Sequence, residues 1–117
     1  MKISVFGLGY VGSVSAACLA KNGHTVLGLE INPQKVELVN SGRAPVIEHG
    51  LDNLMQEAIE RDRLRVISDS RAAVSDSDVS MICVGTPSDK NGNLDLKYVE
   101  NVCRQIGAGL VLGKLEK

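Results

Sequence analysis

The sequence lacks tryptophan, and aromatic residues make up only 3% of its 117 positions. It therefore shows no aromatic platform on which single-stranded nucleic acid could stack its bases. The formal net charge of −1 also argues against nucleic acid or an anionic membrane as the main partner. No apolar run approaches the roughly 20 residues of a membrane span, and the start lacks the long apolar region of a signal peptide. We therefore expect neither a nucleic acid nor a membrane partner.

Cysteine is also scarce, with three residues, Cys18, Cys83 and Cys103. An odd number without metal-ligand spacing predicts neither a disulfide framework nor a metal site. Each cysteine lies in an apolar pattern, which predicts reduced thiols in the core of a cytoplasmic protein. His49 has no partner histidine at ligand spacing, so we expect no metal there either. Length and an apolar content of 44% fit one small globular domain.

Against this background, residues 2–12 are the most informative stretch. A short apolar run with the character of a buried parallel strand leads into Gly7, Gly9 and Gly12, which have the spacing G-x-G-x-x-G. In a dinucleotide-binding turn the first glycine makes the tight turn, and the second lets a pyrophosphate approach the backbone. The third lets the following helix pack closely. The N–H groups at the start of that helix suit a diphosphate.

The spacing predicts a helix over residues 10–22, with Val11, Val14 and Cys18 facing a sheet. Residues 25–31 read as a second strand, which completes one βαβ unit. Such units are right-handed in nearly all cases, so the second strand is expected to run parallel to the first.

Glu30 lies at the end of the second strand, 18 positions after Gly12. A dinucleotide fold places there the carboxylate that accepts hydrogen bonds from the adenosine ribose. A solvated acid at a strand end is the alternative, and the glycines favour the ribose contact. A carboxylate would repel a 2′-phosphate, which favours NAD over NADP. Lys35 lies in the first turn of a helix begun by Asn32-Pro33, where a cation is unfavourable. This hints at a ribose or phosphate contact, although a surface lysine is the default.

Further along the chain, five apolar positions with helical spacing predict an amphipathic helix, and residues 64–67 a third strand. We expect a short helix over residues 70–75 and a buried fourth strand over residues 79–84. A last helix should begin at Asp95, after a staple between Leu94 and Val99, and no further element is completed after Gly107. The predicted helix after residue 50 buries Leu51, Leu54, Met55, Ala58 and Ile59, and the last helix buries Val99, Val102, Cys103 and Ile106.

The fourth strand runs directly into Gly85-Thr86-Pro87-Ser88. The carboxyl ends of the first and fourth strands border the point in a doubly wound sheet where ligands bind. Thr86 is therefore a candidate contact to the cofactor near its nicotinamide half. The alternative is that the Thr-Pro pair merely ends the strand.

These elements predict an α/β fold, a partial Rossmann-type parallel sheet of about four strands in the order 3-2-1-4, with helices on both faces. The fourth strand would then form an apolar edge, and such an edge recruits other chains. We expect the chain to self-associate, or to cover this edge with its own residues 110–115.

Three ordered segments resemble the nucleotide-sugar 6-dehydrogenases, which include the UDP-glucose and GDP-mannose dehydrogenases. They are Gly7-Leu8-Gly9-Tyr10-Val11-Gly12, the stretch from Gly42 to Leu51, and Cys83 to Ser88. The last segment, with residues 91–96 after it, is most similar to the GDP-mannose branch. The resemblance spans nearly the whole chain but covers only the N-terminal NAD domain of these longer proteins. Residues 1–117 are thus expected to be a truncated Rossmann domain without the family's central and sugar-nucleotide-binding domains.

The resemblance implies that two NAD oxidise the sugar C6 alcohol to a carboxylate, a reaction of polysaccharide biosynthesis, through a thioester on a cysteine. That cysteine lies in a later segment, so neither Cys83 nor Cys103 takes its role, and the chain alone is expected to be inactive. The NAD contacts that the resemblance implies are Tyr10, Val11, Glu30, Lys35 and Thr86, beside the three glycines. Two residues depart from the pattern: Glu30 replaces an aspartate, which adds a methylene, and His49 replaces a proline in its loop.

Two other interpretations stay open at this stage. A hydroxyacid dehydrogenase of the 6-phosphogluconate type shares the same front end, but residues 48–51 and the helix after them argue against it. A stand-alone nucleotide-binding or sensing module is the other, because the sequence offers no acid–base pair or activated nucleophile.

Overall fold

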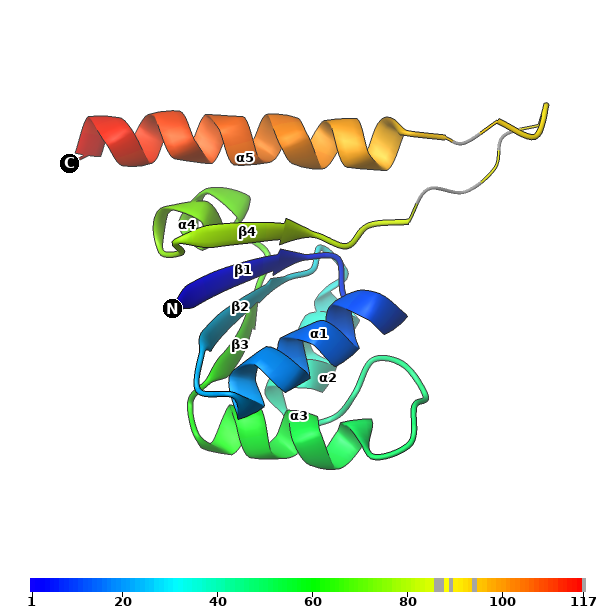
Figure 1. The fold of residues 1–117 in the computed structure, drawn as a ribbon, viewed down its shortest axis with the longest axis vertical. Coiled ribbons are helices and arrows are strands. Elements are labelled where there is room, and N and C mark those ends of the chain that lie inside the picture. The colour runs from blue at the N-terminus through cyan, green and yellow to red at the C-terminus, as the bar shows by residue number, and fades with distance from the viewer. Residues whose placement is uncertain (86–87, 89, 94, 117) are drawn as a thin grey trace.

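The computed structural model describes residues 1–85, 88, 90–93 and 95–116, and the side chains up to residue 111. Figure 1 shows a single parallel sheet with helices packed on it. The elements follow one another as β1 (Lys2–Phe6), α1 (Tyr10–Lys21), β2 (Thr25–Leu29), α2 (Pro33–Asn40), α3 (Leu51–Glu60), β3 (Leu64–Ile67), α4 (Ser70–Ser75), β4 (Val79–Ile82) and α5 (Lys97–Glu116).

The four strands are all parallel and lie in the order β3-β2-β1-β4, which confirms the predicted topology. Side chains of β1 alternate between the two faces of the sheet. Ile3 and Val5 belong to a core shared with α1, α2 and α3. Phe6 belongs to a second core with α4 and α5, which Figure 1 shows side by side. Helices therefore cover both faces, and every strand ends at the same edge of the sheet, the carboxyl edge.

The predicted buried stripe of α1 is wrong for Val11 and Cys18, whereas Val14 is half-buried and packs against the core. Val11 is 69% exposed and Cys18 is exposed, whereas the helix buries its small residues. Small side chains let the helix axis approach the sheet more closely than a valine stripe would allow. The buried residues of α1 are Gly12, Ser13, Ala16, Ala17 and Ala20.

The cysteines correct the same expectation. All three are free. Cys18 and Cys103 are exposed and are not core thiols, whereas Cys83 is half-buried and packs against the core. Cys18 follows Ala17 on the outer side of α1, and Cys103 follows the buried Val102 on the outer side of α5. An apolar neighbourhood in the sequence therefore did not indicate burial here.

The two outer strands of the sheet, β3 and β4, differ in how their unpaired sides are covered. At the β3 edge, the side-chain amide of Asn40 donates to the Val66 carbonyl and accepts from the Val66 N–H, both at 2.9 Å, as a neighbouring strand would. At the other edge, β4 ends at Ile82, shorter than expected, and it is not buried. Val79 is 44% exposed and Ile82 is 41% exposed, because β4 pairs only with β1 in the described sheet.

The last helix is longer than the sequence predicted. It begins at Lys97, whose N–H is capped by the Asp95 side chain at 3.0 Å, and it continues past Gly107 to Glu116. Close packing on α4 explains Gly109, since a Cβ there would lie 2.8 Å from Val74 Cβ. Residues 110–115 thus continue α5 and add no strand beside β4. The predicted staple involves Leu94, which lies outside the described residues.

The other elements agree with the sequence, except that β2 ends at Leu29, two residues before the predicted end. Asn32 caps α2 by accepting from the N–H groups of Gln34 and Lys35, and Asp69 caps α4 in the same way. The amphipathic helix α3 buries Leu51, Met55 and Ala58 as expected. No helix in the described part of the chain is both long and apolar enough to cross a membrane.

Candidate functional site

The turn between β1 and α1 uses its three glycines for different purposes. Gly7 has φ +100°, and a Cβ on it would lie 2.9 Å from the Cys83 carbonyl oxygen. A Cβ on Gly12 would lie only 1.8 Å from the Gly7 carbonyl oxygen. Both glycines are therefore required by the fold itself, as the sequence predicted for the turn and for the close helix packing.

Gly9 differs from the other two. A Cβ built on it meets no atom within 4 Å, and its φ of −80° is open to any residue. It is the N-cap of α1 but offers no capping side chain, so the first N–H groups of the helix are left for another acceptor. Tyr10 and Val11, which follow it, are 59% and 69% exposed. The turn thus presents backbone donors and the positive end of a helix to open space.

Glu30 follows β2 directly and lies at the same carboxyl edge. Its N–H donates to the Ile67 carbonyl at 3.1 Å, and its side-chain Oε1 accepts from the Asn32 N–H at 3.1 Å. The carboxylate is therefore oriented by the backbone that begins α2.

The structure gives no cavity contact for the other two predicted site residues, Lys35 and Thr86. Lys35 lies half-buried in the first turn of α2, close in sequence to Glu30, but it does not line the cavity described below. Thr86 lies outside the described residues, so its predicted contact stays a prediction.

A cavity of about 190 Å³ lies between the ends of β1 and β2 and the side of α5. Among the residues that the structure describes, most of its lining is apolar and Glu30 is the one charged lining residue. Three polar residues of α5, Tyr98, Asn101 and Gln105, complete the lining. The sequence did not predict these three as site residues, although they have helical spacing, because polar residues beside the apolar stripe of a helix normally face solvent. The apolar part of the lining consists of Phe6, Gly7, Leu29, Ile31, Val84 and Val102.

Cys83 is the thiol nearest to the glycine turn. Its N–H donates to the Phe6 carbonyl at 2.8 Å, and its Cβ would be 3.3 Å from a Cβ on Gly12. Burial raises the pKa of the Cys83 thiol above its ordinary value. The neutral thiol is therefore favoured over the nucleophilic thiolate.

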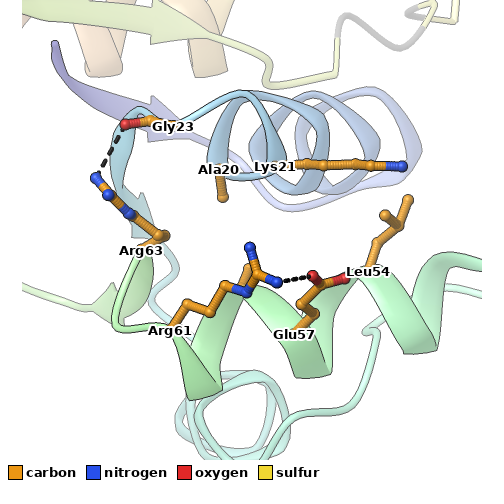
Figure 2. Close-up of a pocket in the computed structure, with 8 residues that line it drawn as sticks. Ala20, Lys21, Gly23, Leu54, Glu57, Arg61 and Arg63 are labelled. Carbon is orange, nitrogen blue, oxygen red and sulfur yellow. Dashed lines mark hydrogen bonds and ion pairs between the residues drawn. The ribbon is translucent and has the colours of Figure 1, made fainter.

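A second hollow, of about 100 Å³, lies between α1 and α3 at the opposite end of the sheet, and Figure 2 shows its lining. Its arginines are already engaged, since Arg61 pairs with Glu57 at 2.9 Å and Arg63 donates to the Gly23 carbonyl at 3.0 Å. Among the described residues no three histidine, cysteine or acidic side chains gather where they could hold a metal ion. The carboxyl edge is therefore the better candidate for a site.

Comparison with known proteins agrees with this geometry. Residues 1–115 match the sequence model of the UDP-glucose/GDP-mannose dehydrogenase family, NAD binding domain. The chain is 54% identical to the GDP-mannose 6-dehydrogenase of Pseudomonas putida over 107 residues, which are 92% of this chain and 24% of that protein. It is 41% identical to the UDP-glucose 6-dehydrogenase of Rhizobium meliloti, over 94% of this chain and 25% of that protein.

A solved ternary complex of GDP-mannose dehydrogenase from Pseudomonas aeruginosa has a similar fold. It superposes with a TM-score of 0.90 at 54% identity, over 92% of this chain and 24% of that one. The chain thus spans about a quarter of the length of the relatives it matches.

Proposed function

Because the chain belongs to the UDP-glucose/GDP-mannose dehydrogenase family through its NAD binding domain, we propose that it is the NAD-binding part of a nucleotide-sugar 6-dehydrogenase. The observation that carries the proposal is the open space above Gly9, which lies at the carboxyl edge together with the oriented carboxylate of Glu30. The pyrophosphate lies over Gly9, Tyr10 and Val11, and the adenosine ribose binds Glu30. Lys35 and Thr86 complete the proposed contacts.

The proposed substrate of the whole enzyme is GDP-mannose, and UDP-glucose is the second candidate. The identity of 54% to a GDP-mannose 6-dehydrogenase, against 41% to a UDP-glucose 6-dehydrogenase, supports this order. The enzyme would oxidise the sugar to its uronic acid with two NAD. In this proposal residues 1–117 are the NAD-binding domain, and the central and sugar-nucleotide-binding domains lie outside them. The cytoplasmic location stays a prediction.

In the same proposal this chain alone does not oxidise the sugar. The raised pKa of Cys83 favours the neutral thiol, and Cys18 and Cys103 are exposed on the outer sides of α1 and α5. The proposal therefore assigns the thioester to a cysteine in a later segment of the family's longer chains, as the resemblance implies. The lack of an assigned nucleophile among these three thiols also supports a second candidate function, that of a nucleotide-binding module without catalysis.

We expect the 117-residue chain to form no NADH with GDP-mannose or UDP-glucose, and to self-associate through the β4 edge. Val79 and Ile82 are exposed along this edge, and unprotected edges pair with other strands. An absorbance assay for NADH and light scattering on the same preparation test both parts. Steady NADH production would contradict the assignment of the catalytic thiol to another segment, and a stable monomer would contradict the edge pairing.

We also expect NAD to bind better than NADP. The Glu30 carboxylate would repel the 2′-phosphate of NADP by about 1–3 kcal/mol, which is roughly one to two powers of ten in affinity. Lys35 reduces this difference. Glu30→Gln should improve NADP binding, whereas Glu37→Gln, an exposed acid on α2, should not. Calorimetry that gives equal affinities for NAD and NADP in the unmodified chain would show that Glu30 does not face the ribose.

A further inference from the structure

The side chain of Asn40 lies where an additional strand would pair with the sheet. β3 is an end strand, because it pairs only with β2 in the described sheet. The carbonyls of Arg63 and Ile67 accept from N–H groups on the β2 side, at 2.7 and 3.1 Å. Because the N–H and C=O groups of alternate residues point to opposite sides of a strand, those of Val66 point away from β2, toward the free side of β3.

Both outward groups of Val66 are already paired. Asn40 Oδ1 accepts from the Val66 N–H at 2.9 Å, and Asn40 Nδ2 donates to the Val66 carbonyl at 2.9 Å. One residue of a neighbouring antiparallel strand would make these same two contacts. β3 contains four residues, of which only Leu64 and Val66 point outward, so a single side chain occupies half of the outward groups of this edge.

The fold holds the carboxamide in this position. Asn40 is the last residue of α2, and Val39 before it is fully buried in the core. The strand itself carries a charge, since Arg65 is exposed between the buried Leu64 and Val66. Covered backbone and charged side chains are both means by which proteins keep end strands from pairing with other chains. The β3 edge thus combines the two.

The edge at β4 has a different character, with Val79 44% exposed and Ile82 41% exposed. If only the β4 edge can pair, two copies join their β4 strands about a two-fold axis, and the assembly closes as a pair. If the β3 edge were free as well, it could pair with the β4 edge of the next copy, and this contact repeats without closing. The state of the β3 edge therefore determines whether assembly stops.

We propose that Asn40 is an edge-blocking residue, whose carboxamide takes the place of a strand at Val66 and prevents a second copy of this chain from pairing with β3. The chain then associates through β4 alone and grows no larger than a pair. This inference does not rest on NAD as the ligand, because Asn40 does not line the cavity beside Glu30.

Light scattering over a range of concentrations tests this limit. The unmodified chain should grow no larger than a pair, whereas the mass of Asn40→Ala assemblies should keep rising with concentration. Asn40→Lys is the matched control, because it removes the same carboxamide but places a charge beside the edge, which opposes strand pairing. It should stay at the size of the unmodified chain. Equal growth of both variants, no added growth of Asn40→Ala, or growth of the unmodified chain beyond a pair would overturn the inference.

Hydrogen exchange followed by NMR, at a concentration too low for assembly, gives a second readout. The Val66 N–H should be protected in the unmodified chain although its strand lies at the end of the sheet. Its exchange should become about 10-fold faster in Asn40→Ala, because one hydrogen bond is lost. Asn53→Ala, at an exposed asparagine on α3, should leave the rate unchanged. If the Val66 N–H of the unmodified chain exchanges as fast as an exposed amide, the inference is wrong and the proposed NAD binding stands.

Discussion

Gly9→Val should abolish NAD binding while leaving the fold intact. The side chain would project into the open space above the turn, where no protein atom lies within 4 Å of the added Cβ and where we place the pyrophosphate. The branched side chain would block the approach of the phosphates to the first N–H groups of α1. We expect the affinity for NAD to fall by a factor of about 100 or more, measured by calorimetry.

The thermal midpoint of Gly9→Val separates a blocked site from an unfolded one. The backbone of Gly9 has a φ of −80°, which a valine can adopt, so the midpoint should change by only a few degrees. Gly107→Val, at another glycine with nothing within 4 Å of its Cβ, is the control and should keep the parent affinity. Undiminished NAD affinity in Gly9→Val would rule out this position for the pyrophosphate.

Gly12→Ala should destabilise the protein by about 3 kcal/mol or more, because the added Cβ would lie 1.8 Å from the Gly7 carbonyl oxygen. Backbone cannot move aside as a flexible side chain can, so either the turn or the start of α1 must shift. The corresponding fall in the thermal midpoint is about 10 °C or more for a domain of this size. Circular dichroism during heating measures it directly.

Gly107→Ala is the matched control for this substitution. Both glycines lie inside helices, where alanine is favoured over glycine by about 0.5–1 kcal/mol, but Gly107 has free space around it. Its midpoint should therefore rise slightly. A Gly12→Ala protein as stable as the parent would show that α1 does not need this close approach.

Most of the fold could be predicted because its signals are local. The strand at residues 2–6, the cap at Asn32 and the amphipathic pattern of α3 each follow from short-range periodicity or capping chemistry, and the structure agrees. Burial was predicted less well, because it depends on which elements meet. The exposed Val11 and the half-exposed β4 reflect the close approach of α1 and the position of β4 at the end of the sheet.

In the candidate site, too, the features with a local signal could be predicted and those that depend on packing could not. The glycine spacing and Glu30 could be found in the sequence because motif and strand end lie within 30 residues of one another. The contribution of α5 could not be found in this way. Its three polar residues reach the cavity because α5 packs along α4, where Val102 and Gly109 lie against Val74. The local pattern predicted an apolar stripe on this helix but did not indicate which element the stripe would meet.

The central claim is that this chain binds NAD at the carboxyl edge of its sheet, and the most direct test is an NMR titration of the isotopically labelled chain with NAD. We predict that the amide signals of residues 7–12 and of Glu30 shift, together with those of α5 that face the cavity. The hollow between α1 and α3 in Figure 2 should be unaffected. Shifts confined to that hollow, or no shifts at saturating NAD, would contradict the claim.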